Sequence, residues 1–358
     1  MLEIIPQIPK FKSFRQFGQP KCLPLNYTLG LTYRCNSRCR TCRIYDKKAK
    51  ELSVAEYQRI FEAIGPAPYW ITLSGGEPFL RQDIDQICQV IYRASHPAII
   101  NIPTNGLLVD LIPQKVARIT ENCPQSQIII NLSLDGIGEE HDDIRQVKGN
   151  YDRALKTYQA LKQLKSKAAN LTLGIHTVIS RFNVTRFPQI YQELITLEPD
   201  NYITEIAERR VELGTLELDI TPSASEYNRA IDYLIEQVGK NRYGGVAKIA
   251  QSFRLQYYRM VKHFLTTGQG LFPCYAGVVS CQIAPTGDVW PCCIKAEIMG
   301  NLTQSDYDLR KIWFSPQAAQ TRRRIRQAKC ACPLANAAYT NMLCHLGTLV
   351  KVGLKLVL

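Results

Sequence analysis

Three cysteines stand close together near the start of the chain, at Cys35, Cys39 and Cys42. Their spacing is CxxxCxxC, and each thiolate of such a run can bind one iron of a 4Fe–4S cluster. Three protein ligands leave the fourth iron open to bind and reduce a substrate, whereas a structural cluster or a zinc site usually closes with four. The basic residues around the run are Arg34, Arg38, Arg40 and Arg43. The pattern therefore predicts an iron–sulfur site with one open coordination position.

Polar residues then follow three strand-like runs, at the point where each run ends. The three sets are Ser74-Gly75-Gly76-Glu77 after residues 70–73, Thr104-Asn105 after residues 100–103, and Ser133 with Asp135 at the end of residues 128–134. Parallel β/α folds place their chemistry at the carboxyl ends of the strands. We therefore expect the three sets to lie at the functional end of a parallel sheet.

The run CxxxCxxC followed by Gly-Gly-Glu-Pro resembles the radical S-adenosylmethionine (SAM) enzymes, and the resemblance extends from the N-terminus to about residue 215. It implies a cluster that binds SAM and receives an electron from a flavodoxin- or ferredoxin-type donor. Reductive cleavage of SAM then gives a 5′-deoxyadenosyl radical, which abstracts hydrogen from a substrate. The cofactor supplies the difficult step, and the protein supplies positioning and electrostatics.

The resemblance assigns a role to the Gly-Gly-Glu segment. Glu77 accepts a hydrogen bond from the SAM ammonium, and Gly75 and Gly76 let the backbone approach closely beside Ser74. The alternative for the two glycines is an ordinary turn.

The same resemblance places further residues at the SAM pocket. Thr104 and Asn105 lie near it, and Ser133 and Asp135 match the positions that contact the ribose. Arg181, at the end of the fifth expected strand, could pair with the SAM carboxylate by charge. Asp135 is followed by glycine, so a turn cap is the alternative for this position.

One position departs from the family pattern. The residue before the third cluster cysteine is usually aromatic and covers the adenine, but here it is Thr41. Ile44 or Tyr45 could take that role instead.

Strand and helix signals alternate from residue 26 to residue 206. Ser53 and Glu56 form a capping box at the start of the first predicted helix. The expected strands span residues 27–33, 70–74, 99–103, 128–134, 171–179 and 201–207, and later helices include 111–120, 150–165 and 186–197. Six β/α units predict an α/β fold, a partial (β/α)6 barrel of the TIM type. The pattern alone also allows an open doubly wound sheet, and the family resemblance favours the barrel.

The expected domain organisation has five parts. They are an N-terminal extension (1–22), the partial barrel (23–222), a helical linker (223–270), a small cysteine-rich α+β auxiliary-cluster domain (271–345) and a basic apolar tail (346–358).

Cysteines return in the last third of the chain, where Cys274 precedes a predicted hairpin turn at residues 285–288 and Cys292 follows it. This arrangement resembles the SPASM/twitch extension of radical SAM enzymes, in which Cys330 and Cys332 would complete a four-thiolate site for a second 4Fe–4S cluster. The cysteine run of a further auxiliary cluster is not clearly present, so the shorter twitch form is expected. Four thiolates also suit a structural zinc ion, which stays open as the alternative.

The remaining cysteines have no assigned ligand role. Cys293 could donate a hydrogen atom to a substrate radical, giving net epimerisation, or it could be buried structure or an alternative ligand. Cys281 and Cys344 also lie outside the four-ligand set. The cysteines expected to pack in the core are Cys22, Cys88 and Cys123.

The composition argues against several classes. No stretch approaches the ~20 apolar residues that span a bilayer, and residues 1–17 lack the unbroken apolar run of a signal peptide. The 13 cysteines suit a reducing cytoplasm, in which thiols serve metals rather than disulfides. The net charge is +13, partly from the arginines of residues 322–326. No aromatic residue is interleaved with them, so a solvated helix face is expected rather than nucleic-acid binding.

Three function classes remain. A ribosomally made peptide is the favoured substrate, because twitch and SPASM extensions often accompany cross-linking, epimerisation or oxidation of peptides. A small molecule, sugar or lipid is the alternative, and the tail at residues 349–358 could lie on a membrane surface. A non-catalytic iron–sulfur electron carrier is the third class, but it would not need an open iron.

Overall fold

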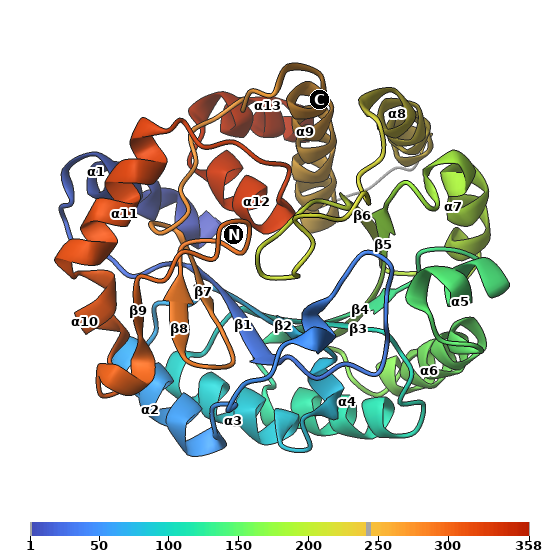
Figure 1. Ribbon diagram of the computed structural model, residues 1–358, viewed down its shortest axis with the longest axis horizontal. Helices are drawn as coiled ribbons and strands as arrows, with labels where there is room; N and C mark the ends of the chain where they lie inside the picture. The colour runs from blue at the N-terminus through green and yellow to red at the C-terminus, as the bar shows by residue number, and fades with distance from the viewer. Residues whose placement is uncertain (1, 241–244, 358) are drawn as a thin grey trace.

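The computed structural model describes residues 2–240 and 245–357. Its first six strands follow the predicted alternation and are β1 (Asn26–Thr32), β2 (Trp70–Gly75), β3 (Ile99–Thr104), β4 (Gln127–Ser133), β5 (Leu171–Ile179) and β6 (Asn201–Ile206). Each pairs in parallel with the next along the chain (Figure 1). All six therefore end at the same edge of the sheet, where the predicted polar sets lie.

Helices cover the outer face of these strands. They are α2 (Val54–Ile64), α3 (Ile84–Ser95), α4 (Leu111–Asn122), α5 (Glu139–Arg145), α6 (Asn150–Lys165) and α7 (Phe187–Ile195). The capping box at Ser53 and Glu56 is present in both directions, as predicted. Apolar helix residues such as Tyr57 and Ile60 join Ile71 and Leu73 of β2 in one hydrophobic core.

The sheet does not close into a barrel. Its strand order is β6-β5-β4-β3-β2-β1-β7-β8-β9, so β6 and β9 are its two edges. The helices α8 (Ala224–Lys240) and α9 (Gly245–Thr267) follow β6, and Arg254 of α9 donates to the carbonyl oxygen of Tyr202 on the β6 edge at 2.9 Å. Side-chain capping of this kind protects an edge strand. The predicted partial barrel is thus confirmed as an open half barrel, with helices on its open side (Figure 1).

The last third of the chain extends the same sheet. Strand β7 (Ser280–Ile283) pairs in parallel with β1, and β8 (Asp288–Trp290) forms the predicted hairpin with β7, followed by β9 (Gly300–Asn301). Gly287 in the turn has φ +84°, which favours glycine. The helices that follow are α10 (Leu309–Trp313), α11 (Pro316–Gln327), α12 (Ala335–Leu343) and α13 (Leu346–Val357). The barrel and the cysteine-rich part therefore share one continuous sheet.

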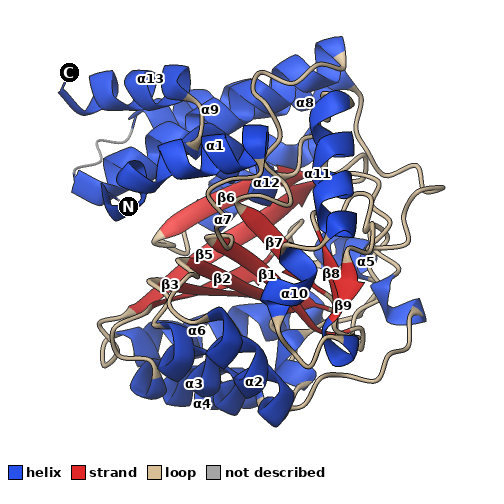
Figure 2. Cartoon of the chain, turned by 90° about the vertical axis from the view of Figure 1, so that its left-hand side faces the viewer, coloured by secondary structure: helices blue, strands red, loops and turns tan. Residues whose placement is uncertain are grey.

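The N-terminal segment packs on the C-terminal third (Figure 2). It forms a 3-10 helix (Leu2–Gln7) and α1 (Ile8–Phe17). Elsewhere in the described residues, short 3-10 helices span Ile44–Asp46, Pro78–Leu80, Val184–Arg186 and Leu302–Gln304. Trp313 donates its indole N–H to the carbonyl oxygen of Cys22 at 3.1 Å, and Arg15 donates to that of Cys274 at 3.0 Å. The predicted extension is thus a support for the cysteine-rich part.

The predicted apolar tail forms α13, with Val352 buried and Leu346 and Val350 exposed. Leu358 of the tail and residues 241–244 of the predicted linker lie outside the described residues. Within the described ranges, no helix has the length and apolar character needed to cross a membrane.

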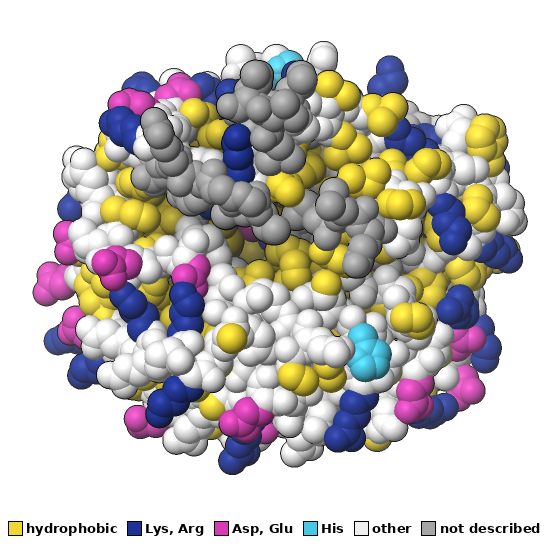
Figure 3. Space-filling view, turned by 180° about the vertical axis from the view of Figure 1, so that it is seen from behind, with side chains coloured by type: hydrophobic (Ala, Val, Ile, Leu, Met, Phe, Trp, Pro, Cys, Tyr) yellow, Lys and Arg dark blue, Asp and Glu magenta, His cyan; other side chains and the backbone are white. Residues whose placement is uncertain are grey.

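Seen from behind, the surface is hollowed near its centre, and most charged side chains lie towards the margins (Figure 3).

Candidate active site

The three predicted cluster ligands lie in one loop between β1 and α2, at residues 33–53, which we call the cysteine loop. Cys35, Cys39 and Cys42 are free, half-buried thiols that interact electrostatically with one another. Burial raises the pKa of Cys35 to about 11 and that of Cys42 to about 12. A bound metal supplies the positive charge that deprotonates such thiols. The donor set therefore fits an iron–sulfur cluster.

Arg145 at the end of α5 reaches this loop. Its Nη1 lies 3.8 Å from the Cys39 sulfur, and its Nη2 lies 2.7 Å from a carboxylate oxygen of Asp135. The carbonyl oxygen of Arg145 also accepts from the backbone N–H of Arg38 at 3.1 Å. Burial opposes the charge of Arg145, but Asp135 and Cys39 outweigh burial and raise its pKa further above the ordinary value. Asp135, which was predicted to contact the ribose, therefore forms an ion pair with Arg145. Arg145 was not predicted from the sequence.

Gly75 and Gly76 let β2 approach the cysteine loop. A Cβ on Gly75 would lie 2.3 Å from the carbonyl oxygen of Thr32, and one on Gly76 would lie 2.0 Å from that of Arg34. The backbone N–H groups of Gly76 and Glu77 donate to the same two oxygens, at 2.7 and 2.9 Å. The two glycines therefore allow the end of β2 to lie directly against the backbone that precedes Cys35.

Glu77 is a buried carboxylate at the centre of the strand ends. It accepts from the Thr104 hydroxyl at 2.8 Å, the Asn105 backbone N–H at 2.8 Å and the Phe79 backbone N–H at 3.2 Å. Burial raises the pKa of Glu77 to about 7, although these three donors partly offset the effect. A carboxylate has about four acceptor positions, so one remains for a ligand donor such as an ammonium.

Asn105 joins the end of β3 to the cysteine loop. Its amide donates to Asn36 at 2.7 Å and to the Ser37 hydroxyl at 3.1 Å, and its own oxygen accepts from the Leu107 backbone N–H at 3.0 Å. With Glu77, it gathers β2, β3 and the cysteine loop around one point.

Other predicted positions lie outside this group. Ser74 and Ser133 are half-buried at the ends of β2 and β4, and Ser133 is in register with His176 of β5. Arg181 pairs with Asp219, and its side chain is 49% exposed. The structure brings Glu77, Thr104 and Asn105 to the cysteine loop but directs Arg181 to a different partner.

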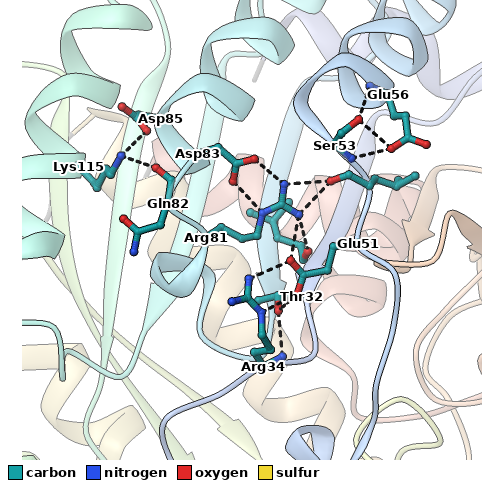
Figure 4. Close-up of polar contacts among 12 residues, drawn as sticks. Thr32, Arg34, Glu51, Ser53, Glu56, Arg81, Gln82, Asp83, Asp85 and Lys115 are labelled. Carbon is teal, nitrogen blue, oxygen red and sulfur yellow. Dashed lines mark hydrogen bonds and ion pairs between the residues drawn. The ribbon is translucent and has the colours of Figure 1, made fainter.

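A second set of residues missed by the sequence analysis closes the base of the cysteine loop (Figure 4). Arg81 is buried and donates twice to the carbonyl oxygen of Leu52, at 3.0 Å each, while Asp83 holds its guanidinium in a fork at 2.8 Å. Glu51 pairs with Arg81 at 3.4 Å and with Arg34 at 2.9 Å. We call Glu51, Arg81 and Asp83 the clasp. The sequence held a signal for this set, because Arg81 follows Glu77 by four positions and has the acidic residue Asp83 two positions further on.

The two residues that could cover the adenine in place of Thr41, Ile44 and Tyr45, differ in exposure. Ile44 is buried at 2% exposure. Tyr45 is half-buried, and the guanidinium of Arg38 lies 4.5 Å from its ring centroid. Tyr45 is therefore the one aromatic ring beside Thr41 in the described cysteine loop.

The four predicted auxiliary ligands come from three segments. Cys274 precedes β7, Cys292 follows β8, and Cys330 and Cys332 lie between α11 and α12. The thiols of Cys274 and Cys330 share a hydrogen bond, which raises the pKa of Cys274 and lowers that of Cys330 to about 6. Cys332 interacts electrostatically with Cys292 and Cys330. The structure thus brings the four thiols into one region, and four thiolates are the donor set of a closed cluster.

Cys293 lies beside two of these four, because Cys292 and Cys332 pack against the small cluster that contains it. Its sulfur is 3.9 Å from Nη1 of Arg210, and the residue packs with Leu334 and Ala337. The cysteines that lie in the main hydrophobic core are Cys22, Cys88, Cys123, Cys281 and Cys344.

Two family models match the chain. Residues 29–194 match the radical SAM superfamily, and residues 274–333 match an iron-sulfur cluster-binding domain named SPASM. The first range contains the cysteine loop and Glu77, and the second contains all four auxiliary thiols. The second match favours a cluster over zinc at those thiols.

Similar proteins include the mycofactocin maturase MftC of Mycolicibacterium smegmatis, 25% identical over 90% of this chain and 78% of the relative. The AdoMet-dependent heme synthase of Methanosarcina barkeri is 24% identical over 84% of this chain and 85% of the relative. Among solved structures, Streptococcus suis SuiB bound to S-adenosylmethionine has a TM-score of 0.63 and 14% identity, covering 88% of this chain and 71% of that one. SuiB bound to its precursor peptide SuiA gives a TM-score of 0.62 and 15% identity, covering 90% and 72%.

Fold, cysteine positions and family models agree on one assignment. The chain belongs to the radical SAM superfamily, as an enzyme with a C-terminal SPASM domain whose cofactors are 4Fe–4S clusters and SAM.

Proposed function

We propose that this enzyme modifies a ribosomally made peptide by radical chemistry. The observation that carries the proposal is the likeness to the mycofactocin maturase MftC across 90% of the chain. The fold likeness to SuiB, which has been solved with a precursor peptide, supports it. Cross-linking, epimerisation and oxidation are the outcomes that fit this chemistry.

The chain's own residues would divide the work at the cluster. When bound, the cluster and SAM supply a 5′-deoxyadenosyl radical that abstracts hydrogen from substrate. Cys35, Cys39 and Cys42 hold three irons, and the free acceptor position of Glu77 holds the SAM ammonium. Arg145 places a positive charge beside Cys39.

The inner face of the half barrel suits a peptide backbone. Along β2, Ile71 points to the helices, and the alternate residues Trp70 and Thr72 point inwards. A hydrogen-bonded row crosses this inner face, since Trp70 donates to Thr72 at 3.0 Å, Asn101 donates to Thr72 at 3.4 Å and Asn131 donates to Asn101 at 2.7 Å. Amide and hydroxyl groups match the donors and acceptors of main-chain peptide groups.

The proposal is tested with short peptides encoded beside this gene. Co-expression with the enzyme, followed by mass spectrometry, should show a defined mass change or a deuterium-detectable epimer in one of them. A matched co-expression with Glu77→Ala controls for cellular modification. If no neighbouring peptide changes while the purified enzyme cleaves SAM, the peptide assignment is wrong.

A small-molecule substrate is the second candidate, and one observation favours it. The heme synthase relative matches 84% of this chain and 85% of its own length. Spectra of the enzyme incubated anaerobically with SAM and a porphyrin precursor distinguish the two. A changed porphyrin with unchanged peptides would establish the second candidate.

We also propose that an acidic flavodoxin or ferredoxin in the reducing cytoplasm donates the electron. The exposed basic residues around the cysteine loop support this docking, and they are Arg34, Arg38, Arg40, Arg43, Lys48 and Lys50. Association steered by such charges slows steeply with salt. The rate of SAM cleavage with flavodoxin should therefore fall as salt rises, while the rate with dithionite should change little. Equal salt dependence with both reductants would contradict the docking surface.

A further inference from the structure

The segment between β6 and α8 passes between the two cysteine regions. The backbone N–H of Arg43, which directly follows Cys42, donates to the carbonyl oxygen of Leu213 at 2.9 Å. On the other side, the N–H of Glu212 donates to the carbonyl oxygen of Cys293 at 3.3 Å. Adjacent residues of one segment are thus bonded to the two different ligand-bearing loops.

These bonds place the two loops close together. Hydrogen-bonded neighbouring backbones lie about 5 Å apart, so the loops on either side of this segment are separated by about 10 Å. Three further bonds strengthen the arrangement. Val211 N–H donates to the carbonyl oxygen of Ile294 at 3.1 Å, and the ammonium of Lys47 donates to the carbonyl oxygens of Val211 and Glu212 at 2.9 and 2.6 Å.

The segment is also closed on itself. The hydroxyl of Thr215 accepts from the Arg210 backbone N–H at 2.9 Å, and the Thr215 N–H donates to the Arg210 carbonyl oxygen at 3.2 Å. Gly214 has φ +65°, and a Cβ there would lie 3.6 Å from the Cβ of Arg43. Thr215 has no exposed surface. The turn at residues 210–215 is therefore held in one shape.

Buried charges fix the segment to the sheet. Arg210 lies 2.9 Å from Glu208 and 3.3 Å from Glu205 of β6, and Gln282 of β7 donates to Glu212 at 2.6 Å. Glu208 and Glu212 are each 8% exposed. An ordinary surface crossover leaves its charges in water, because taking them out costs free energy unless they are paired.

We propose that residues 208–215, which we call the strap, position the cysteine loop against the loop at residues 291–299 that carries Cys292, so that the two cluster sites respond as one unit. The inference rests on the proposed ligands Cys42 and Cys292. Displacing the strap should move both loops, whereas a plain crossover would affect only stability.

The test uses Thr215→Val, which keeps the side-chain shape and removes the hydroxyl. Thr215→Ser restores the hydroxyl. The matched control is Thr120→Val in α4, where another buried threonine hydroxyl donates to the carbonyl oxygen of Ala117 within its own helix at 2.7 Å. Reconstituted proteins are compared by iron content, by EPR of both reduced clusters and by SAM titration of the EPR signal.

Thr215→Val should retain the iron of both clusters, change both EPR signals and weaken SAM affinity by about tenfold, the order of one net hydrogen bond. Thr215→Ser and Thr120→Val should match the unmodified enzyme. If Thr215→Val does not fold, Lys47→Met at the half-buried edge of the strap should change both signals in the same direction.

Each contrary result has a distinct meaning. An unmodified enzyme with one cluster contradicts the ligand assignment and the strap together. The strap alone is contradicted if the unmodified enzyme has both clusters but Thr215→Val leaves both EPR signals unchanged. It is also contradicted if Thr215→Val changes only one of the two signals.

Discussion

Glu77 is the residue that we propose binds the SAM ammonium. Three protein donors hold its carboxylate, and one acceptor position remains for the SAM ammonium. Glu77→Ala should leave both clusters assembled and weaken SAM binding roughly ten- to hundredfold, the value of a charge-assisted hydrogen bond. SAM titration of the EPR line shape measures this. An unchanged dissociation constant would mean that another group holds the ammonium.

Arg145 makes an electrostatic prediction at the same scale. A cation beside Cys39 stabilises the reduced, more negative cluster, so its loss should lower the cluster's reduction potential. Arg145→Met should show this lowered potential in an EPR-monitored redox titration, together with a stability loss of about 3–5 kcal/mol from leaving Asp135 buried and unpaired.

Arg145→Lys keeps the charge and serves as the control, with a potential close to that of the unmodified enzyme. An unchanged potential in Arg145→Met would show that Arg145 acts only as a partner for Asp135.

Single residues were predictable where their type is tied to one chemistry. The cysteine spacing and the Gly-Gly-Glu run predicted the family, which the family model confirms, because few other roles require them. Arg145 escaped prediction because its partners, Cys39 and Asp135, are brought to it only by the fold. Arg181 illustrates the reverse case, since a position at the end of β5 did not reveal that Asp219 would be its partner.

At the scale of elements, the clasp determines how the cysteine loop begins and ends. Arg81→Lys would keep the charge but lose the fork to Asp83 and the paired donation to Leu52. We expect a broadened EPR signal of the cluster on the cysteine loop and weaker SAM binding.

The neighbouring buried pair provides a matched control. Lys115 pairs with Asp85 at 2.8 Å beside the clasp but joins α4 to α3 rather than the cysteine loop (Figure 4). Lys115→Met should therefore lower stability without changing either cluster signal. If Arg81→Lys and Lys115→Met changed the EPR signal of this cluster equally, the clasp would contribute only to general stability.

The strands agreed with prediction to within one or two residues, because apolar runs ending in polar residues mark buried parallel strands. Helix α5 was not predicted. Its sequence, Glu139–Arg145, is dominated by charged residues and has no apolar periodicity. Its last turn accepts hydrogen bonds from the cysteine loop at the carbonyl oxygens of Ile144 and Arg145, and local sequence does not reveal these contacts.

At the scale of the molecule, the auxiliary site joins segments far apart in the chain. Metal binding at such a site contributes to folding. Cys330→Ala should lower the iron content towards one cluster and lower the thermal stability of the C-terminal part. It should retain SAM cleavage without substrate, because that reaction uses the cysteine loop. Iron analysis and calorimetry measure the first two effects, and full retention of iron would remove Cys330 from the ligand set.

The sequence indicated separate barrel and cysteine-rich parts, but the structure joins them through the pairing of β1 with β7. Asn26 and Ser280 are neighbours in that pairing although they are far apart in sequence. Periodicity identifies strands but not their distant partners, so the continuous sheet and the strap could be seen only in the fold.

The central claim is that Cys35, Cys39 and Cys42 hold the cluster that cleaves SAM. The most direct test measures 5′-deoxyadenosine after anaerobic reconstitution, reduction and addition of SAM. The unmodified enzyme should form it, and the triple variant Cys35→Ala, Cys39→Ala, Cys42→Ala should form none while keeping the iron of the auxiliary site. Formation of 5′-deoxyadenosine by the triple variant would contradict the account.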